Sequence, residues 1–189
     1  MTCCIGYKTN KKIYFISDTQ GSNDDNKEIR LDPKIFKMNN MLFATCGSFR
    51  MRDVLRYELD IPKLKIGEDI DRYIRTTVIN AIRDLFVDKG ICIKTDETDL
   101  ASPGDILINI KDKIYKIESD FQVGEINKPY VAIGCGAREA MAAMSMYERF
   151  FNLPETKKEV NTFLINTLAT VAELNINVND EYNMLSKVI

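Results

Sequence analysis

The sequence contains no histidine among its 189 residues. This absence excludes the Ser-His-Asp and Cys-His pairs on which many hydrolases rely, and it excludes zinc sites that need histidine ligands. A hydrolase with this sequence needs another base that works near neutral pH. The α-amino group is the natural candidate, because its unperturbed pKa is roughly 7.7–8.0. The missing histidine is therefore compatible with an N-terminal nucleophile but does not require one.

Several other features are also missing. No apolar stretch approaches the length of a membrane span, and the first residues lack the basic start and apolar segment of a signal peptide. The formal net charge is −2, without a strongly basic region, so neither nucleic acid nor a membrane is an evident partner. The sequence also lacks the P-loop of ATP-binding proteins. We expect a cytoplasmic protein without these partners.

Cysteine is present in an odd number of copies and without the spacing of metal ligands. The five positions are Cys3, Cys4, Cys46, Cys92 and Cys135. Free thiols in a reducing cytoplasm are the simplest interpretation of this set. We accordingly expect neither a metal nor a cofactor.

The pattern of apolar residues predicts one α+β domain over residues 1–189, and 45% of the residues are hydrophobic. Residues 19–27 are polar and are expected to form a loop. Apolar alternation predicts strands at residues 3–8, 13–16, 28–31, 34–38, 41–46, 105–110, 113–117 and 130–133. Helical spacing predicts helices at residues 49–59, 68–88, 136–151 and 154–174. Strands and helix pairs in this order fit a layered sandwich of antiparallel sheets.

Thr2 follows Met1, and threonine is small enough for methionine aminopeptidase to remove the methionine before it. A threonine at the chain start combines a nucleophile and a base, because its hydroxyl attacks while its own α-amine accepts the proton. A retained Met1 acylates that amine and removes the base. The position gains meaning only from the residues that follow it.

Two charged residues and a glycine-rich turn stand at informative positions. Asp18 lies sixteen residues after Thr2, at the end of an apolar run. Lys34 lies thirty-two residues after Thr2 and follows a segment rich in turn residues. Gly134-Cys135-Gly136 separates an expected strand from an expected helix.

In this order, the features resemble the β-type subunits of the proteasome, and especially the shorter bacterial HslV-type peptidase. The opening TCCIGYKTNKKIYFISDTQ resembles the Thr-first hairpin of that family, and RLDPKIFKM resembles the segment that holds its catalytic lysine. Three later segments also match, namely FATCGSFRMRDVLRYEL, YVAIGCGAREAMAAM and VAELNINVND. The resemblance covers almost the whole chain. It implies a four-layer αββα sandwich with an N-terminal threonine nucleophile, the fold of the Ntn hydrolases.

The resemblance also implies a role for the central residues. Thr2 is the expected nucleophile. Lys34 is expected to stay cationic beside it, favouring the alkoxide, while Asp18 orients and neutralises Lys34. Cys3 and Cys4 are rival nucleophiles, but the spacings to Asp18 and Lys34 fit Thr2 without a gap.

Three positions depart from the family pattern. The oxyanion glycine of the family falls on Ala44, with Thr45 as the alternative, and a backbone N–H can serve at either position. Cys135 stands where the family has a helper serine. Glu173 stands where the family has a helper aspartate near the C-terminus, and we expect it to be a solvated residue at a helix end.

These expectations describe a threonine-type endopeptidase that acts on polypeptides. By resemblance it forms a homo-oligomeric ring, hexameric as in the HslV type, and a separate AAA+ ATPase unfoldase feeds it. Leu42 and Phe43, with Met41, are expected to line the substrate cleft and to favour an apolar residue before the cut. Two alternatives remain open: a catalytically inactive ring or scaffold protein on the same fold, and an amide hydrolase that is not a peptidase.

Overall fold

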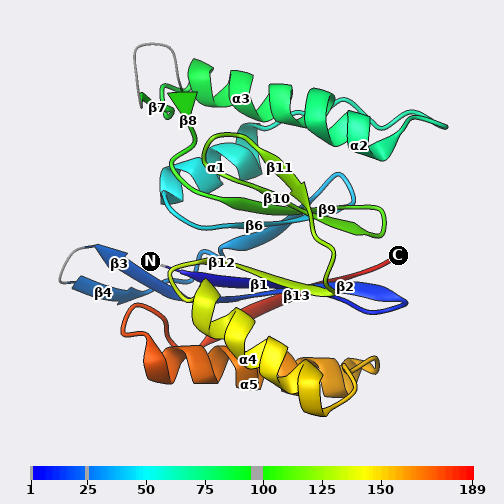
Figure 1. The fold of residues 1–189 in the computed structure, drawn as a ribbon. Helices are drawn as coiled ribbons and strands as arrows, with labels where there is room; N and C mark the ends of the chain where they lie inside the picture. The colour runs from blue at the N-terminus through cyan, green and yellow to red at the C-terminus, as the bar shows by residue number, and fades with distance from the viewer. Residues whose placement is uncertain (1, 24–25, 95–99) are drawn as a thin grey trace.

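Two antiparallel β-sheets stack face to face, and helices cover both outer faces of the stack (Figure 1). This architecture is seen in a computed structural model that describes residues 2–23, 26–94 and 100–189. The layers follow the order helix, sheet, sheet, helix, which confirms the expected αββα sandwich. No helix within the described ranges is long and apolar enough to cross a membrane.

The first sheet contains the chain start and has the strand order β12-β1-β2-β13. The expected hairpin of residues 3–8 and 13–16 is confirmed as β1 and β2. Its turn is closed by Thr9, whose N–H donates to the carbonyl oxygen of Lys12 while its hydroxyl oxygen accepts from the N–H of Lys12. The strands are β1 (Cys3–Lys8), β2 (Lys12–Asp18), β12 (Tyr130–Gly134) and β13 (Tyr182–Val188).

The second sheet has the strand order β11-β10-β9-β6-β5. Its strands are β5 (Ile35–Met38), β6 (Met41–Thr45), β9 (Ile106–Ile110), β10 (Lys113–Ile117) and β11 (Val123–Glu125). Two short hairpins lie outside the main sheets and consist of β3 (Gln20–Asn23) with β4 (Asn26–Ile29), and of β7 (Ile93–Lys94) with β8 (Leu100–Ala101). The expected loop at residues 19–27 is therefore wrong in part, because β3 and β4 pair as a polar ribbon, while residues 24 and 25 lie outside the described residues.

The helices largely follow the sequence pattern. The expected helix at 68–88 begins two residues later and contains a π-helical segment, Ile74–Val78, between two α-helical parts. The expected helix at 154–174 begins at Lys157, because Thr156 caps it and forms a capping box with Glu159. The α-helices are α1 (Phe49–Glu58), α2 (Ile70–Tyr73), α3 (Ile79–Asp88), α4 (Ala137–Phe150) and α5 (Lys157–Leu174).

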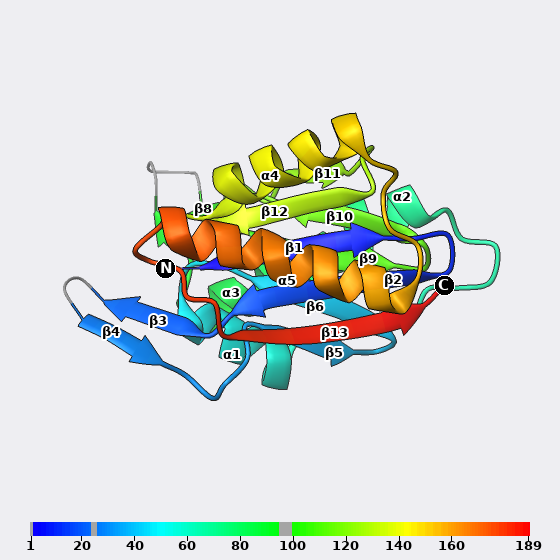
Figure 2. The same ribbon diagram turned by 90° about the horizontal axis from the view of Figure 1, so that it is seen from below.

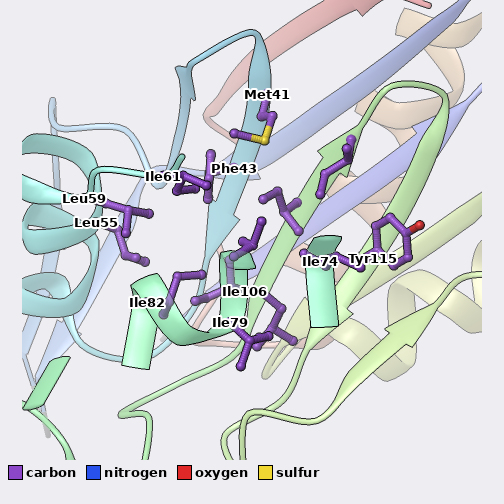
Figure 3. Packing of buried hydrophobic residues seen from close by; sticks show 14 of the residues in the cluster. Met41, Phe43, Leu55, Leu59, Ile61, Ile74, Ile79, Ile82, Ile106 and Tyr115 are labelled. Carbon is purple, nitrogen blue, oxygen red and sulfur yellow. The ribbon is translucent and has the colours of Figure 1, made fainter. Parts of the chain in front are cut away.

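Hydrophobic residues fill each of the three spaces between the layers. One cluster lies between the second sheet and helices α1 to α3, and Figure 3 shows Phe43, Leu55, Ile82 and Ile106 converging there. A second cluster lies between the first sheet and the pair α4 and α5, which lie over the sheet in Figure 2. A third cluster joins the two sheets. The stacked sheets bring one end of β1, β2, β5 and β6 together, and that end holds the candidate site.

Candidate active site

Thr2 precedes β1 directly and is almost completely buried, with 5% of its surface exposed. Its carbonyl oxygen faces the turn that follows β12, where the N–H of Gly136 lies 3.4 Å away. The Cys135 thiol also contacts Thr2, with Sγ 3.4 Å from both the backbone nitrogen and the carbonyl oxygen. The expected proximity of Thr2 and Cys135 is thus a feature of the structure.

Gly134 allows this close approach. It has a φ of +94°, and a Cβ atom at this position lies only 2.2 Å from the Thr2 carbonyl oxygen. A side chain here must displace the backbone of Thr2, so glycine is required for two reasons, conformation and space. Asn175 fixes the same turn from the other side, because its Nδ2 donates to the carbonyl oxygen of Cys135 at 3.2 Å.

Asp18 and Lys34 form a buried ion pair. Lys34 Nζ lies 2.7 Å from Asp18 Oδ1, and the two side chains expose 3% and 0% of their surface. Lys34 Nζ also donates to the carbonyl oxygen of Gln20 at 2.7 Å. The expected contact between the two charged residues is confirmed, although they stand sixteen positions apart in the sequence.

The ion pair is attached to the residue next to Thr2. The N–H of Cys3 donates to Asp18 Oδ1 at 2.9 Å, which is the same oxygen that accepts from Lys34. One carboxylate oxygen therefore joins the start of β1 to the ammonium group. This bond places Thr2 next to a residue that contacts the ion pair. Among the ion pairs of the described residues, Asp18–Lys34 is the only one in which both side chains are buried.

A polar shell around Asp18 was not expected from the sequence. The N–H of Gln20 donates to Asp18 Oδ2 at 3.2 Å. Asn179, also buried, accepts from the N–H groups of Thr19 and Gln20, each at 3.0 Å, and so holds the backbone that follows Asp18. The signal in the sequence was the segment VAELNINVND, which includes Asn179 and resembles the end of the HslV-type chain.

Burial controls the titration of this region. It raises the pKa of Asp18 above the ordinary 3.8, while the Lys34 ammonium and two backbone N–H groups oppose that rise. Burial also raises the pKa of the Cys3 and Cys4 thiols strongly. Because a thiolate is the reactive form of cysteine, this environment disfavours both residues as nucleophiles.

The two expected oxyanion donors lie inside the second sheet. The N–H of Thr45 donates to the carbonyl oxygen of Lys34 at 3.1 Å. Ala44 pairs with Leu107 of β9, and Cys46 donates to Asp105 on the same side of β6. Because N–H directions alternate along an antiparallel strand, the Ala44 N–H also points into the β6–β9 ladder. Neither N–H faces an open space, so the expectation that Ala44 or Thr45 donates to the oxyanion is not met by this geometry.

Gly47 is a donor that the sequence reasoning missed. It follows β6, is exposed, and has a φ of +105°. Among the backbone hydrogen bonds of the described residues, none is donated by the Gly47 N–H. The Cβ atom of its neighbour Cys46 lies 3.4 Å from the position that a Cβ would take at Gly134. Gly47 is therefore close to the turn after β12 that contacts Thr2. A glycine two positions after the end of a buried strand was the available signal.

The substrate-lining expectation for Leu42 and Phe43 is wrong in this structure. Their side chains expose 1% and 0% of their surface, because β6 is an inner strand with hydrophobic clusters on both faces. The open cleft near the site is instead polar. It has a volume of about 630 Å³ and is lined by Gly21, Ser22, Asn26, Lys27, Glu28, Arg30, Gly47, Ser48 and Phe49.

One remaining expectation concerns the periphery. Glu173 is exposed near the end of α5, as expected for a solvated residue. Across the part of the chain that the structure describes, no group of three cysteine, aspartate or glutamate side chains has the arrangement of a metal site.

Solved structures share this architecture at low sequence identity. BPH from Thiobacillus denitrificans, solved in complex with epoxomicin, is 18% identical and has a TM-score of 0.79, with 98% of each chain covered. HslV from Trypanosoma brucei is 12% identical with a TM-score of 0.67, covering 97% of this chain and 98% of that one. The Anbu complex from Pseudomonas aeruginosa, described as a helical assembly, is 13% identical with a TM-score of 0.68, covering 98% and 81%.

The fold is the one seen in these BPH and HslV structures. No protein-family model matches the sequence, and no curated protein matches it at the sequence level. At identities of 12–18%, the likeness concerns the fold, so the chemistry has to be inferred from the residues of this chain.

Proposed function

We propose that the protein is a threonine-type peptidase in which Thr2, freed by removal of Met1, is the nucleophile. The proposal rests on one observation above all, the buried Asp18–Lys34 pair that is hydrogen-bonded to the residue after Thr2. Burial of an ion pair costs free energy unless the geometry of the pair is good and its remaining donors and acceptors are hydrogen-bonded. A pair of this kind beside a chain-start threonine has an evident chemical use.

In the proposed reaction, the Thr2 hydroxyl attacks the carbonyl carbon of an amide bond. The α-amine of Thr2 accepts the hydroxyl proton and later gives it to the leaving amine. Lys34 favours the alkoxide by its positive charge and lowers the pKa of the amine, while Asp18 keeps Lys34 oriented. The N–H of Gly47 supplies the hydrogen bond to the oxyanion in place of Ala44. The Cys135 thiol lies 3.4 Å from the Thr2 nitrogen, which becomes the amine when Met1 is removed, and can then relay its proton.

We also propose that the protein works as a homo-oligomer on polypeptide substrates in the cytoplasm. A ring, hexameric as in the HslV type, and a helical arrangement like that described for Anbu are the two geometries to distinguish. Polypeptide substrates that are folded require a separate AAA+ unfoldase. Light scattering and electron microscopy of the purified protein test the assembly, and a monomer at micromolar concentration contradicts it.

The decisive experiment compares protein with and without a free Thr2 amine. Insertion of a glutamate between Met1 and Thr2 blocks methionine removal and keeps the remaining sequence unchanged. We expect hydrolysis of short peptides, and a mass gain with epoxomicin, only in the processed protein. Equal activity in the two proteins shows that the amine is not the base and contradicts the mechanism.

Substitutions of Thr2 complete the test. Thr2→Ala removes the nucleophile and is expected to abolish turnover, whereas Thr2→Ser keeps hydroxyl and amine and is expected to retain part of it. An inactive processed protein with an intact oligomer supports the alternative of a scaffold on this fold. Activity on simple amides without activity on peptides supports the other alternative, a non-peptidase amide hydrolase.

A further inference from the structure

A second pocket lies at the opposite end of the sheets from Thr2, where the hairpin tips gather. It has a volume of about 310 Å³. Its walls come from the β5–β6 turn, the β9–β10 turn, the connection between α1 and α2, and the last part of β13. Figure 1 shows this end of the molecule on the side of the C-terminus and the site on the side of the N-terminus.

The floor of this pocket is apolar. Met41, Ile61, Tyr73 and Ile110 contribute to it and belong to the hydrophobic cluster under the helices, and the partly buried Leu64 packs against that cluster. The Tyr73 hydroxyl is already bonded to the carbonyl oxygen of Pro62 at 2.8 Å. The floor therefore offers a ligand mainly hydrophobic contact.

A buried asparagine connects two of the chain segments that line the pocket. Asn109 accepts from the N–H of Leu42 at 2.7 Å and donates to the carbonyl oxygen of Lys111 at 2.9 Å. These two bonds tie the start of β6 to the β9–β10 turn. Lys111 has a φ of +52°, a left-handed conformation that lysine seldom adopts, so the turn is held in one shape. A pocket that exists before binding does not require a ligand to order its walls.

The rim of the pocket is cationic. Lys63, Lys111 and Lys187 line it, and in the described ranges no carboxylate lies within ion-pair distance of any of them. Burial lowers the pKa of Lys187, and the nearby Lys37 ammonium lowers it further. Three lysines in one rim without a paired acid leave an excess of positive charge above an apolar floor.

We propose that this pocket binds a small carboxylate with an apolar chain, of the size of octanoate. The carboxylate occupies the lysine rim, and the chain lies on the floor formed around Leu64 and Ile61. Small-molecule sites typically combine a concave apolar lining with a few polar groups, in volumes from about 300 Å³ upward. A simple inorganic anion leaves the floor empty, and a neutral apolar molecule leaves the lysines without a partner.

Titration calorimetry with a ligand series tests the two halves of this site separately. Octanoate is expected to bind tighter than hexanoate by roughly tenfold, because two more methylene groups are buried. Acetate has the anion without the chain, and octan-1-ol has the chain without the anion, so both are expected to bind much more weakly than octanoate. The absence of octanoate binding at millimolar concentration overturns the proposal. Equal binding of octanol or of acetate does so as well.

Variants locate the site on the protein. The double variant Lys63→Met/Lys187→Met is expected to weaken octanoate binding by roughly tenfold, about threefold for each charge, without weakening octanol binding. Leu64→Glu places a like charge at the floor and is expected to abolish octanoate binding. Lys65→Met is the matched control, since Lys65 is exposed in the same connection but does not line the pocket. Unchanged binding in the double variant or in Leu64→Glu, or a loss in the control, contradicts the assignment.

Discussion

The two ends of the sandwich use lysine in opposite ways. At the end that holds Thr2, Lys34 is buried and pairs with Asp18. At the hairpin end, Lys63, Lys111 and Lys187 surround an apolar pocket, and within the described chain none of them forms an ion pair. The same side chain is fixed by the fold at one end and left available to a ligand at the other.

The difference shows what burial demands of a charge. A buried ammonium must be paired and hydrogen-bonded, because water is not there to solvate it. The resulting arrangement is rigid, and it can be used to stabilise a developing negative charge. A partly exposed ammonium is solvated without a partner, so its charge remains free to select an anion. The following experiments separate the two cases.

Lys34→Met is expected to have the largest effect. Removal of the ammonium leaves Asp18 buried and uncompensated, which costs roughly 3–5 kcal/mol in the free energy of unfolding. Turnover is expected to fall to background, because the charge beside Thr2 is lost. Denaturant unfolding and peptide hydrolysis measure the two effects.

The double variant Asp18→Asn/Lys34→Met sharpens this result. Since the two residues are in direct contact, their separate costs are not expected to add. A double variant that is less destabilised than the sum of the single variants confirms the coupling. Additive costs show that the pair does not act as a unit.

Gly134→Ala is expected to have the next largest effect on stability and activity. The added Cβ meets the Thr2 carbonyl oxygen at 2.2 Å and also requires a φ near +94°. The left-handed conformation costs about 1–2 kcal/mol, and the overlap adds roughly 1–3 kcal/mol. Gly67→Ala, near the lysine pocket, is the control, because its φ is +79° but no atom lies within 4 Å of the added Cβ. The melting temperature of Gly134→Ala should be lower than that of Gly67→Ala. Only Gly134→Ala should impair hydrolysis.

The pH dependence of hydrolysis tests the state of the buried pair. Burial raises the pKa of Asp18 above 3.8, so the folded protein protonates this carboxyl at a higher pH than a free aspartate does. Protonation removes the negative charge that orients Lys34. kcat/KM is therefore expected to fall first as the Thr2 amine is protonated, and to fall more steeply, with a second proton, as pH decreases through the raised pKa of Asp18. An acid limb that keeps the slope of a single proton down to pH 3.8 contradicts the assignment.

Lys187→Met is expected to have the smallest effect. Burial already disfavours the charged form of Lys187, and no described carboxylate loses a partner when the charge is removed. The free energy of unfolding should change by no more than about 0.5 kcal/mol, with hydrolysis unaffected. A loss as large as that of Lys34→Met shows that the two ends do not differ in the way described.

The sequence by itself determined a layered sandwich of antiparallel strands and helices, since apolar alternation in the strands and helical spacing in α1, α3, α4 and α5 follow directly from which faces are buried. The four-layer αββα order came from the resemblance to the proteasome β-type family. The same resemblance indicated the triad of Thr2, Asp18 and Lys34, whose spacings match that family without a gap. Residues 19–27 were misjudged because a polar ribbon has no apolar signal to mark it as paired strand.

Only the tertiary structure decided which backbone groups and side chains face the site. Ala44 and Phe43 are apolar residues in an apolar run, and nothing local in the sequence says that sheet pairing and two covering layers remove them from the cleft. Asn179 and Asn109 meet their partners across more than sixty residues of chain. Such contacts depend on how the two sheets stack, and neither propensity nor periodicity along one segment contains that information.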